Sequence, residues 1–320
     1  MSDDNKKRVV LVARSLQMGG IERNTVNLAN TLVDMGHDVH IVVFKRRDVL
    51  QPRKEVYLHH FPVDRINRLT GIGLLYDLLT RWFLATTIPR SGFVWRGIYN
   101  TLLFKRVMLR RIEREYGPVD HIIARGHGAF ELLWNFHDPR FTQVIVSPVS
   151  KKRVAWLDRW YTRLLFSAKH NVCNSTGVLE SLQALMSMHG LKSATERVIF
   201  NPIPIEHIRE QAKCWAPLPK QPYVVHVGRL VKQKNQELLL RAYHKSGIEE
   251  LLVIVGDGVE GPKLKDLALE LGLEDKVIFT GQQTNPYPWM RGARVFVLNS
   301  RHEGYSGPHI PDNGLSCCQR

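Results

Sequence analysis

Short apolar segments alternate with amphipathic ones along the chain, and this alternation constrains the fold more than any other feature. The segment from Arg8 to Ala13 is apolar and rich in β-branched residues, which is typical of a buried parallel strand. After a loop, residues 21–35 place apolar side chains at near-helical spacing, and Gly36 follows as a helix stop. A second strand-like segment runs from Asp38 to Phe44. This order of strand, loop, helix and strand predicts a parallel sheet covered by helices.

The second half of the chain repeats the alternation. We expect first-half strands near residues 121–124, 144–148, 170–175 and 197–202, and second-half strands at 223–227, 251–255, 276–279 and 294–298, with helices at 236–245, 262–271 and about 286–292. Five prolines between positions 202 and 222 indicate an extended linker. The fold class predicted is α/β, with two doubly wound domains, residues 1–205 and 206–320, facing a cleft. Ligands of such sheets bind beyond the carboxyl ends of the strands.

Positive charge is concentrated in the first part of the chain. Residues 1–200 hold 30 lysines and arginines against 17 acidic residues, a net charge of +13, whereas residues 201–320 hold 15 against 13, a net charge of +2. Residues from about 48 to 116 form a basic, aromatic insert, in which residues 78–84 and 99–109 are expected to be amphipathic helices. Two interpretations stay open: these helices lie on an anionic membrane surface, or they pack as core and as walls of an acceptor pocket.

Several classes of protein are not favoured by the sequence. No segment reaches the ~18 apolar residues of a membrane-spanning helix, and no signal peptide is evident, so a cytoplasmic protein is expected. The four cysteines form no CxxC pair, so a zinc site is not expected. No cofactor is expected either. Basic composition by itself permits a nucleic-acid-binding protein, but no recognition module is present, so nucleic acid is not an expected partner.

Glycines and cations follow several predicted strands. Arg229 and Lys234 lie between a strand and a helix. Two cations beside a helix N-terminus can bind a diphosphate there, or the segment is a solvated basic turn. Gly256 and Gly258 follow the next strand and permit either close approach of a ligand or a tight turn. Glu303, after a later strand, is placed to accept hydrogen bonds from sugar hydroxyls or to be a surface residue.

The first domain has its own candidate loops. Gly19 and Gly20 precede a helix and can admit a phosphate or an acceptor, although they do not form the G-x-G-x-x-G pattern of dinucleotide-binding folds. A basic segment, residues 45–47, stands where an NAD-binding chain has an acid. His127 follows a predicted strand and is either a packed side chain or a site residue.

Together, these segments resemble the retaining glycosyltransferases of family 4, which have the two-Rossmann-domain architecture called GT-B. The resemblance is found in VGRLVKQKN, LLVIVGDG, KVIFTG and RVFVLNSRHEGY, in the opening GGIERNTVNLANTLVDMGHDVHIVV, and in VCNSTGVLESL and VIFNPI. It covers most of the chain apart from the basic insert and the last fifteen residues. Motifs that occur in order at suitable spacing are much more specific than any one of them.

The resemblance implies a role for each matching residue. Arg229 and Lys234 match the pair that binds the donor diphosphate, and Gly19 and Gly20 match the glycine loop beside the donor phosphate and acceptor. His127 and Glu303 match catalytic residues near the transferred sugar, and the donor-loop residues are Gly256, Gly258, Gly304 and Tyr305. The implied chemistry is sugar transfer with retention and without an essential metal. Positive charge then stabilises the departing phosphate.

The last residues depart from the family pattern. The second acid of the family's E-x7-E motif is expected at position 311, which is Pro311. Two prolines and Gly314 disfavour the helix expected there. We therefore expect an incomplete second domain, truncated or read in a shifted frame from about Ser306, and a marginally stable or inactive product. Reading the gene in all frames tests this expectation.

The leading hypothesis is a glycosyltransferase for a membrane-borne glycan acceptor, such as lipopolysaccharide core or a lipid-linked oligosaccharide. The expected donor is a UDP- or GDP-sugar, and the expected location is cytoplasmic, with peripheral association with the anionic inner-membrane surface. The alternatives are an inactive, pseudogene-like remnant of such an enzyme and a basic nucleic-acid-binding protein. Stronger binding to DNA than to liposomes would favour the last alternative.

Overall fold

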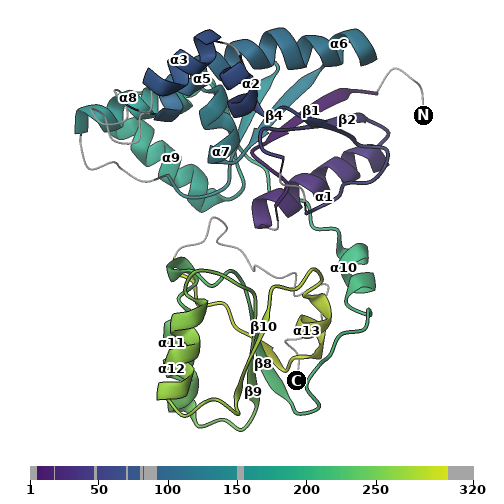
Figure 1. Cartoon of the computed structure of the whole chain (residues 1–320), viewed down its shortest axis with the longest axis vertical. Helices are drawn as coiled ribbons and strands as arrows, with labels where there is room; N and C mark the ends of the chain where they lie inside the picture. The colour runs from purple at the N-terminus through teal and green to yellow at the C-terminus, as the bar shows by residue number, and fades with distance from the viewer. Residues whose placement is uncertain are drawn as a thin grey trace. The chain divides into compact units, whose positions relative to one another are not determined.

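A computed structural model describes residues 6–17, 19–46, 49–69, 71–79, 82, 92–149 and 155–301 (Figure 1). The chain forms two compact units, and the change from one to the other falls between Pro202 and Ile203. This position is close to the expected boundary after residue 205. Within the described residues, no helix is long and apolar enough to cross a membrane.

The first unit is built on a seven-stranded parallel sheet with the order β3-β2-β1-β4-β5-β6-β7. Its strands are β1 Arg8–Ala13, β2 Asp38–Val43, β3 Tyr57–His60, β4 His121–Arg125, β5 Phe141–Ile145, β6 His170–Cys173 and β7 Thr195–Val198. Strand order reverses between β1 and β4. This reversal defines the doubly wound topology.

Helices cover both faces of this sheet (Figure 1). They are α1 Gly20–Asp34, α2 Val63–Leu69, α3 Gly71–Leu79, α5 Gly92–Leu103, the π-helical η3 Phe104–Leu109, α6 Arg110–Tyr116, α7 His127–Phe130, the 3-10 helix η4 Glu131–Leu133, α8 Ala155–Phe166 and α9 Thr176–Met188. Alternate side chains of β1 serve two cores because strand side chains alternate between faces. Leu11 packs in the core that includes Ala29 of α1. Val10 packs in the opposite core with Phe104 and Ile112.

The second unit has a four-stranded parallel sheet with the order β10-β9-β8-β11. Its strands are β8 Tyr223–Val227, β9 Leu251–Val255, β10 Val277–Gly281 and β11 Val295–Phe296. Its helices are α10 Ile205–Gln211, the 3-10 helix η5 Lys232–Lys234, α11 Gln236–Ser246, α12 Gly261–Glu270 and α13 Tyr287–Gly292. Leu240 of α11 and Leu264 of α12 pack on one face of the sheet, and Trp289 of α13 packs on the other (Figure 1).

The two-domain α/β architecture that we expected is confirmed, and strands 223–227 and 251–255 have the predicted bounds. Other elements differ. The helix expected over residues 99–109 begins at Gly92 and continues through the π-helical turn to Tyr116. Of the helix expected over residues 78–84, residues 78 and 79 end α3, which begins at Gly71, and residues 80, 81, 83 and 84 lie outside the described part of the chain.

The proline-rich linker was predicted incompletely, and β3, at the edge of the first sheet, was not predicted. Residues 205–211 form α10, and Pro204 lies at its N-cap, where a proline does not interrupt a helix. Ile208 of α10 packs against Met290 of α13, so tertiary contact stabilises this short helix. Strand β3 was missed because its four residues, YLHH, are half polar.

Candidate functional site

Each sheet reverses its strand order once, and most of the candidate loops lie at these reversals; the loop with Gly256 and Gly258 follows β9, the next strand along. In the first sheet the neighbouring strands are β1 and β4, and in the second they are β8 and β11. Connections from two such strands leave toward opposite faces of the sheet, so a crevice opens at their carboxyl ends.

In the second unit, the loops after three strands are hydrogen-bonded to one another. The Gly228 amide donates to the Val255 carbonyl at 2.9 Å, and the Leu230 amide donates to the Asp257 carbonyl at 3.0 Å. The Gly256 amide in turn donates to the Gly281 carbonyl at 2.9 Å. The loops after β8, β9 and β10 therefore form one connected backbone layer.

Gly256 and Gly258 are explained by this backbone contact. A Cβ atom on Gly256 would lie 2.0 Å from the Gly228 carbonyl oxygen, and one on Gly258 would lie 2.3 Å from the Leu230 carbonyl oxygen. Gly256 also has a φ of 144°, which L side chains rarely adopt. Of the two explanations that the sequence left open, packing of a tight loop is sufficient for both glycines.

Arg229 and Lys234 lie in the loop after β8, as predicted. Arg229 is exposed and Lys234 is half-buried. The Lys234 stem lies along Gly228, because a Cβ on that glycine would be 3.7 Å from the lysine Cδ. Lys234 ends the 3-10 turn η5, and Asn235, in the left-handed conformation, leads directly into α11. Two cations thus stand at the carboxyl end of β8, beside the N-terminus of an 11-residue helix.

The segment after β11 closes against this loop. The Arg301 amide donates to the Gln233 carbonyl at 2.9 Å, and the Arg301 Nε donates to the Asn235 side-chain oxygen at 3.2 Å. Asn299 donates from its side chain to the Asn235 carbonyl at 2.8 Å. Arg301 therefore joins Arg229 and Lys234 as a third cation at this strand end. We did not predict a role for Arg301, because its position after a strand was the only signal in the sequence.

A buried pair of polar residues connects the loop after β8 with the segment after β11. His226 and Gln236 are both almost fully buried. Gln236 Nε2 donates to the Arg229 carbonyl at 2.9 Å and lies 3.2 Å from His226 Nε2. His226 Nδ1 lies 2.9 Å from the Val297 carbonyl, beyond β11. Since a carbonyl only accepts, Nδ1 carries the proton and Nε2 accepts from Gln236.

A separate hollow lies on the α12 side of the same unit. It has a volume of about 460 Å³ and is lined by Gly256, Gly281 and Lys265, with Asp257 and Asp266 among its charged residues. Glu303, Gly304 and Tyr305 lie outside the described residues.

In the first unit, Gly19 and Gly20 are at the start of α1. Gly19 is the N-cap in an extended conformation, and a Cβ on Gly20 would meet nothing within 4 Å. The loop after β4 lies against this region, since a Cβ on Gly126 would be 3.3 Å from Ile21 Cγ2. The carboxyl ends of β1 and β4 thus bring the glycine pair and the segment that begins α7 together. A helix N-terminus at such an edge can bind an anion.

His127 begins α7 and lines a hollow of about 230 Å³ together with Glu131, Pro148, Val149, Asp158, Tyr161 and Leu185. Its Nδ1 lies 3.8 Å from Glu131 Oε1, which also accepts a 2.7 Å hydrogen bond from the Tyr161 hydroxyl. Asp158 is held by His189 at 2.8 Å. The hollow therefore presents carboxylates, a phenol and an imidazole, groups that hydrogen-bond to hydroxyls.

Glu131, Asp158 and Tyr161 were not predicted. They come from η4 and α8, and only the fold brings them beside His127. Nearby, Arg125 at the end of β4 is buried and donates to Asn201 at 2.8 Å. Burial lowers the pKa of Arg125 to about 10. In the described part of the chain, no three His, Cys, Asp or Glu side chains are grouped to hold a metal ion.

The glycosyltransferase family 4 model matches residues 18–207, and the model described as glycosyl transferases group 1 matches residues 208–309. The chain is 48% identical over 254 residues to the lipopolysaccharide core biosynthesis glycosyltransferase LpsD of Rhizobium meliloti, an alignment that covers 76% of this chain and 68% of LpsD.

A second relative is the N-acetylgalactosamine-N,N'-diacetylbacillosaminyl-diphospho-undecaprenol 4-alpha-N-acetylgalactosaminyltransferase of Campylobacter jejuni. It is 38% identical over 144 residues, which span 45% of this chain and only 38% of the relative. Among solved structures, a glycosyltransferase from Rickettsia africae has a TM-score of 0.62 at 16% identity, covering 92% of this chain and 73% of that one. HepE of Anabaena in complex with UDP and glucose has a TM-score of 0.57 at 16% identity, covering 92% and 74%.

Proposed function

Because the chain belongs to glycosyltransferase family 4, we propose that it transfers a sugar, with retention, from a nucleotide-sugar donor to a lipid-borne glycan. The observation that carries the proposal is the cation cluster at the carboxyl ends of β8 and β11. Arg229 and Lys234 stand there beside the start of α11, in the unit that matches the group 1 model. A diphosphate is the group whose charge and size suit this cluster.

The cations act on the leaving group. When the bond between the anomeric carbon and the diphosphate oxygen breaks, negative charge builds on that oxygen. The guanidinium of Arg229 and the ammonium of Lys234 stabilise this charge without a metal. Glu303 and the adjacent Gly304 and Tyr305 are proposed near the transferred sugar. Gly256 and Gly258 act indirectly, because they let the loop after β8 pack against its neighbour.

The first unit supplies the acceptor side of the proposal. His127 and the hollow that contains Glu131 and Tyr161 offer hydrogen-bonding groups for sugar hydroxyls. At the start of α1, Gly20 leaves open backbone, whereas the Glu22 carboxylate lies over Gly19, 2.4 Å from where a Cβ would be. The relatives named for lipopolysaccharide core biosynthesis and for undecaprenol-linked glycans support a lipid-borne acceptor. We place the reaction at the cytoplasmic face of the inner membrane.

UDP is the first nucleotide to test, since HepE was solved with UDP. Calorimetric titration of the chain with UDP, GDP and ADP should show preferential binding of UDP or GDP. Arg229→Ala and Lys234→Ala should each weaken diphosphate binding and reduce turnover by ~10²–10³-fold, as the loss of one preorganised charge does elsewhere. Arg241→Ala is the matched control because Arg241 lies on α11 and pairs with Glu237 on the surface.

The anomeric configuration of the product tests retention. Nuclear magnetic resonance of the product should show the same anomeric configuration as the donor, and an inverted product would overturn the proposed stereochemistry. Nucleotide binding without any turnover, on a panel of donors and lipid-linked acceptors, would favour an inactive remnant of the family.

A further inference from the structure

Arg125 is the last residue of β4 and is only 5% exposed. Within the described part of the chain, it is the one arginine that is buried. Burial lowers its pKa only to about 10, so the guanidinium stays charged at neutral pH. An arginine is almost never fully buried unless it is paired, because water no longer solvates its charge. The charge of Arg125 therefore requires a counter-ion.

The fold gives Arg125 a neutral partner. Its Nη2 donates to the Asn201 side-chain oxygen at 2.8 Å, and its Nε is enclosed without a hydrogen-bond partner. Among the residues that the structure describes, no carboxylate is paired with it, and burial is the one influence on its pKa. An amide oxygen satisfies one N–H of the guanidinium but does not balance a unit charge. The described part of the chain thus lacks the counter-ion.

Arg140 shows how this unit holds an arginine that serves the fold. Its Nε and Nη2 donate to the two oxygens of Asp138 at 2.9 and 2.8 Å, and its Nη1 donates to Glu113 at 2.9 Å. Arg140 is half-buried, so its charge is less costly to enclose than that of Arg125. Two acids nevertheless surround it. The absence of an acid beside the more deeply buried Arg125 therefore indicates a role in binding rather than in folding.

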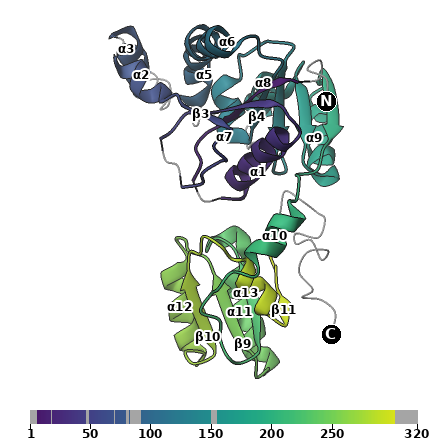
Figure 2. The same cartoon turned by 90° about the vertical axis from the view of Figure 1, so that its right-hand side faces the viewer.

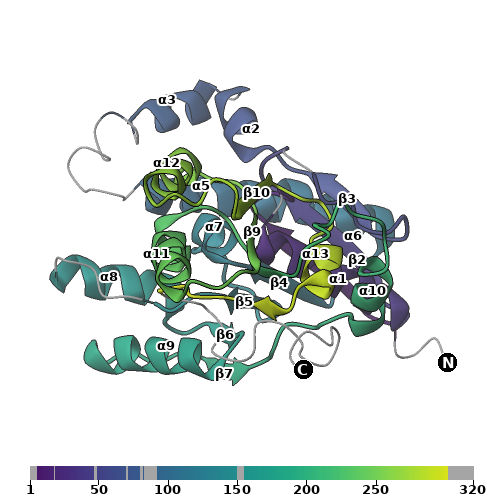
Figure 3. The ribbon, with the colours of Figure 1, turned by 90° about the horizontal axis from the view of Figure 1, so that it is seen from below.

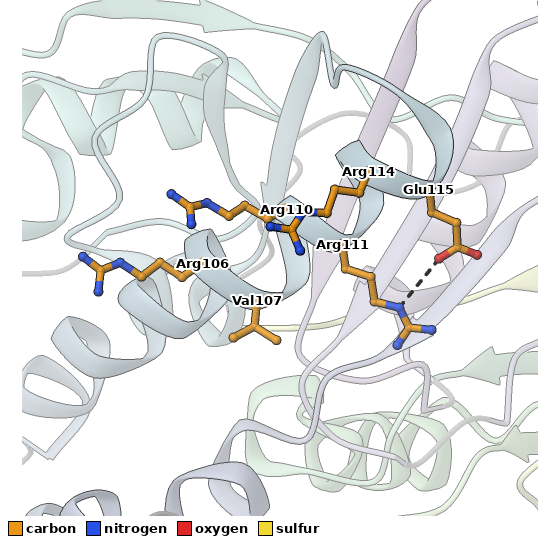
Figure 4. A pocket seen from close by; sticks show the side chains of 6 residues that line it. All are labelled: Arg106, Val107, Arg110, Arg111, Arg114 and Glu115. Atoms are coloured by element: carbon orange, nitrogen blue, oxygen red, sulfur yellow. Dashed lines mark ion pairs between the residues drawn. The ribbon is translucent and has the colours of Figure 1, made fainter.

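The arginines of η3 and α6 are the opposite case. A hollow of about 440 Å³ on these helices is lined by Val107, Glu115 and an arginine row that consists of Arg106, Arg110, Arg111 and Arg114 (Figure 4). All four arginines are exposed, and Arg111 Nε lies 3.7 Å from Glu115. Water solvates these guanidinium groups, so they need no counter-ion in the folded chain. Burial is what separates Arg125 from them.

Arg125 belongs to an edge where four neighbouring strands end, β4, β5, β6 and β7 (Figure 3). Asn174 follows β6 and is almost fully buried. Its Nδ2 donates to the carbonyl of Val146, after β5, at 3.4 Å, whereas its Oδ1 is enclosed without a partner. Val146 also contacts the loop after β4, because a Cβ on Gly126 would be 3.7 Å from its Cγ2. This edge therefore holds an enclosed donor, Arg125 Nε, and an enclosed acceptor, Asn174 Oδ1.

The segment that supplies Asn201 has no regular secondary structure. It occupies residues 199–204, between β7 and α10 (Figures 2 and 3). Ile199 and Phe200 within it are each more than half exposed. Hydrogen bonds between two charged groups are stronger than those from a charged group to an amide. An oxyanion that takes the place of the Asn201 amide on Arg125 would therefore bind more strongly than the group it replaces.

We propose that Arg125 binds an oxyanion, a carboxylate or a phosphate monoester, that is carried by a sugar of the acceptor glycan. Arginine binds both groups in a bidentate manner, and a sugar hydroxyl beside the oxyanion can donate to Asn174. One guanidinium suits one oxyanion, so the ligand is an acidic or phosphorylated sugar rather than a diphosphate. The inference deepens the proposed function and rests on it, since it names the chemical class of the acceptor.

Calorimetry with sugar probes tests this site in the whole chain. Glucuronate and glucose 6-phosphate should raise the thermal unfolding transition of the first unit, and glucose at the same concentration should not. Arg125→Gln should weaken binding of both anionic probes at least about tenfold. So that anion binding elsewhere does not interfere, every chain compared lacks the arginine row: Arg106→Gln, Arg110→Gln, Arg111→Gln and Arg114→Gln. No shift with either anionic probe, or equal shifts with and without Arg125→Gln, would overturn the proposal.

Asn201→Ala separates ligand binding from anchoring of the chain. This change removes the neutral partner and leaves the guanidinium, so the anionic probes should bind as tightly as before or more tightly. If Arg125 only anchors Asn201, Arg125→Gln and Asn201→Ala should instead weaken probe binding equally, which would contradict the proposal. Arg163→Gln is the control for loss of charge, because Arg163 is an exposed arginine of α8 in the same unit. It should leave probe binding unaltered.

Donor binding and sugar transfer distinguish this inference from the proposed function. Arg125→Gln should bind UDP as the wild type does, and a loss as large as that of Arg229→Ala would assign Arg125 to the donor and overturn the inference. Acceptors are compared in pairs that differ only in one carboxylate or phosphate. The wild type should prefer the anionic member about 100-fold in kcat/KM, and Arg125→Gln should lose this preference. Transfer with equal efficiency to both members would overturn the inference and leave the function standing.

Discussion

At the residue scale, Gln236 links the backbone of the candidate diphosphate loop to the interior of the second sheet. Its side-chain amide is donated to the Arg229 carbonyl and to His226, which in turn contacts the carbonyl of Val297. The side chains of His226 and Gln236 are almost fully buried, so either one would lose its hydrogen bond without gaining one to water if its partner were removed. Gln236 is therefore a positioning residue for Arg229, although it is not itself directed at a ligand.

Gln236→Leu should weaken UDP binding about three- to tenfold, which corresponds to roughly 1 kcal/mol for one positioning hydrogen bond. The measurement is calorimetric titration with UDP. Gln183→Leu, an exposed change in the first unit, should leave the affinity unaltered. A Gln236→Leu chain that folds and binds UDP as tightly as the wild type would show that Arg229 does not depend on this contact.

His40 is a buried residue whose protonation in acid should destabilise the first unit. It is fully buried on β2, stacked on Tyr57 with ring centroids 4.8 Å apart, and its Nδ1 lies 2.9 Å from His59 Nε2. Burial, followed by the charges of His59 and Arg8, lowers the pKa of His40 to about 4. The unfolded chain takes up this proton near pH 6.5, whereas the folded chain does so only near pH 4.

The contribution of neutral His40 to the free energy of unfolding should therefore be fully present above pH 6.5. It should be lost as the pH falls from 6.5 towards 4, which lowers the free energy of unfolding by on the order of 2–3 kcal/mol. Urea unfolding at pH 7 and pH 5 measures the decline. His40→Phe retains the ring stack and removes the proton site, so its decline should be smaller than that of the wild type. Identical pH dependence in the two chains would exclude His40 as the source.

At the scale of elements, the loops after β8 and β9 are mutually dependent. Gly256 allows the two backbones to touch, and its positive φ adds a second requirement. Gly272 has a φ of 63°, but a Cβ there would meet nothing within 4 Å. Gly256 and Gly272 both have a positive φ, but only Gly256 is in backbone contact. Comparing substitutions at the two positions therefore separates the effect of backbone contact from the effect of a positive φ alone.

Gly256→Ala should destabilise the second unit by more than about 3 kcal/mol, because the methyl group displaces the Gly228 carbonyl and the Arg229 loop with it. Gly272→Ala should cost only about 1 kcal/mol, the usual penalty of a left-handed alanine. Chemical denaturation measures both values. Equal losses would mean that the strained conformation, rather than contact between the loops, explains Gly256.

At the scale of the whole molecule, each unit has its own sheet and its own hydrophobic clusters. Calorimetry should therefore show a transition for each unit. His40→Phe should shift only the first-unit transition, and Gly256→Ala only the second. UDP should raise the transition that Gly256→Ala lowers, by about 2.7 kcal/mol at a hundredfold excess over the dissociation constant. A UDP effect on the first-unit transition alone would contradict the placing of the diphosphate site.

The sequence by itself determined the kind of fold and the sites to examine. Strand and helix periods are local properties, so the segments at Tyr223–Val227 and Leu251–Val255 were predicted at their observed bounds. The positions of Arg229 and Lys234 after a strand were equally local. Short elements such as β3 and α10 were missed, because tertiary packing, rather than a repeating pattern, stabilises them.

Tertiary structure decided which of these segments meet. The order of strands in a sheet depends on crossover connections, which leave no local signal. This order brings Arg301 into contact with Gln233 and Asn235, the two neighbours of Lys234, and places Tyr161 in the same hollow as His127. Tertiary structure also supplied an explanation for Gly256 that needs no ligand, a tight turn, since only the fold brings Gly228 into contact with it. In the same way, only the folded chain reveals that the leucines of α3 and the arginines of η3 and α6 face outward, because burial is a property of neighbours rather than of sequence.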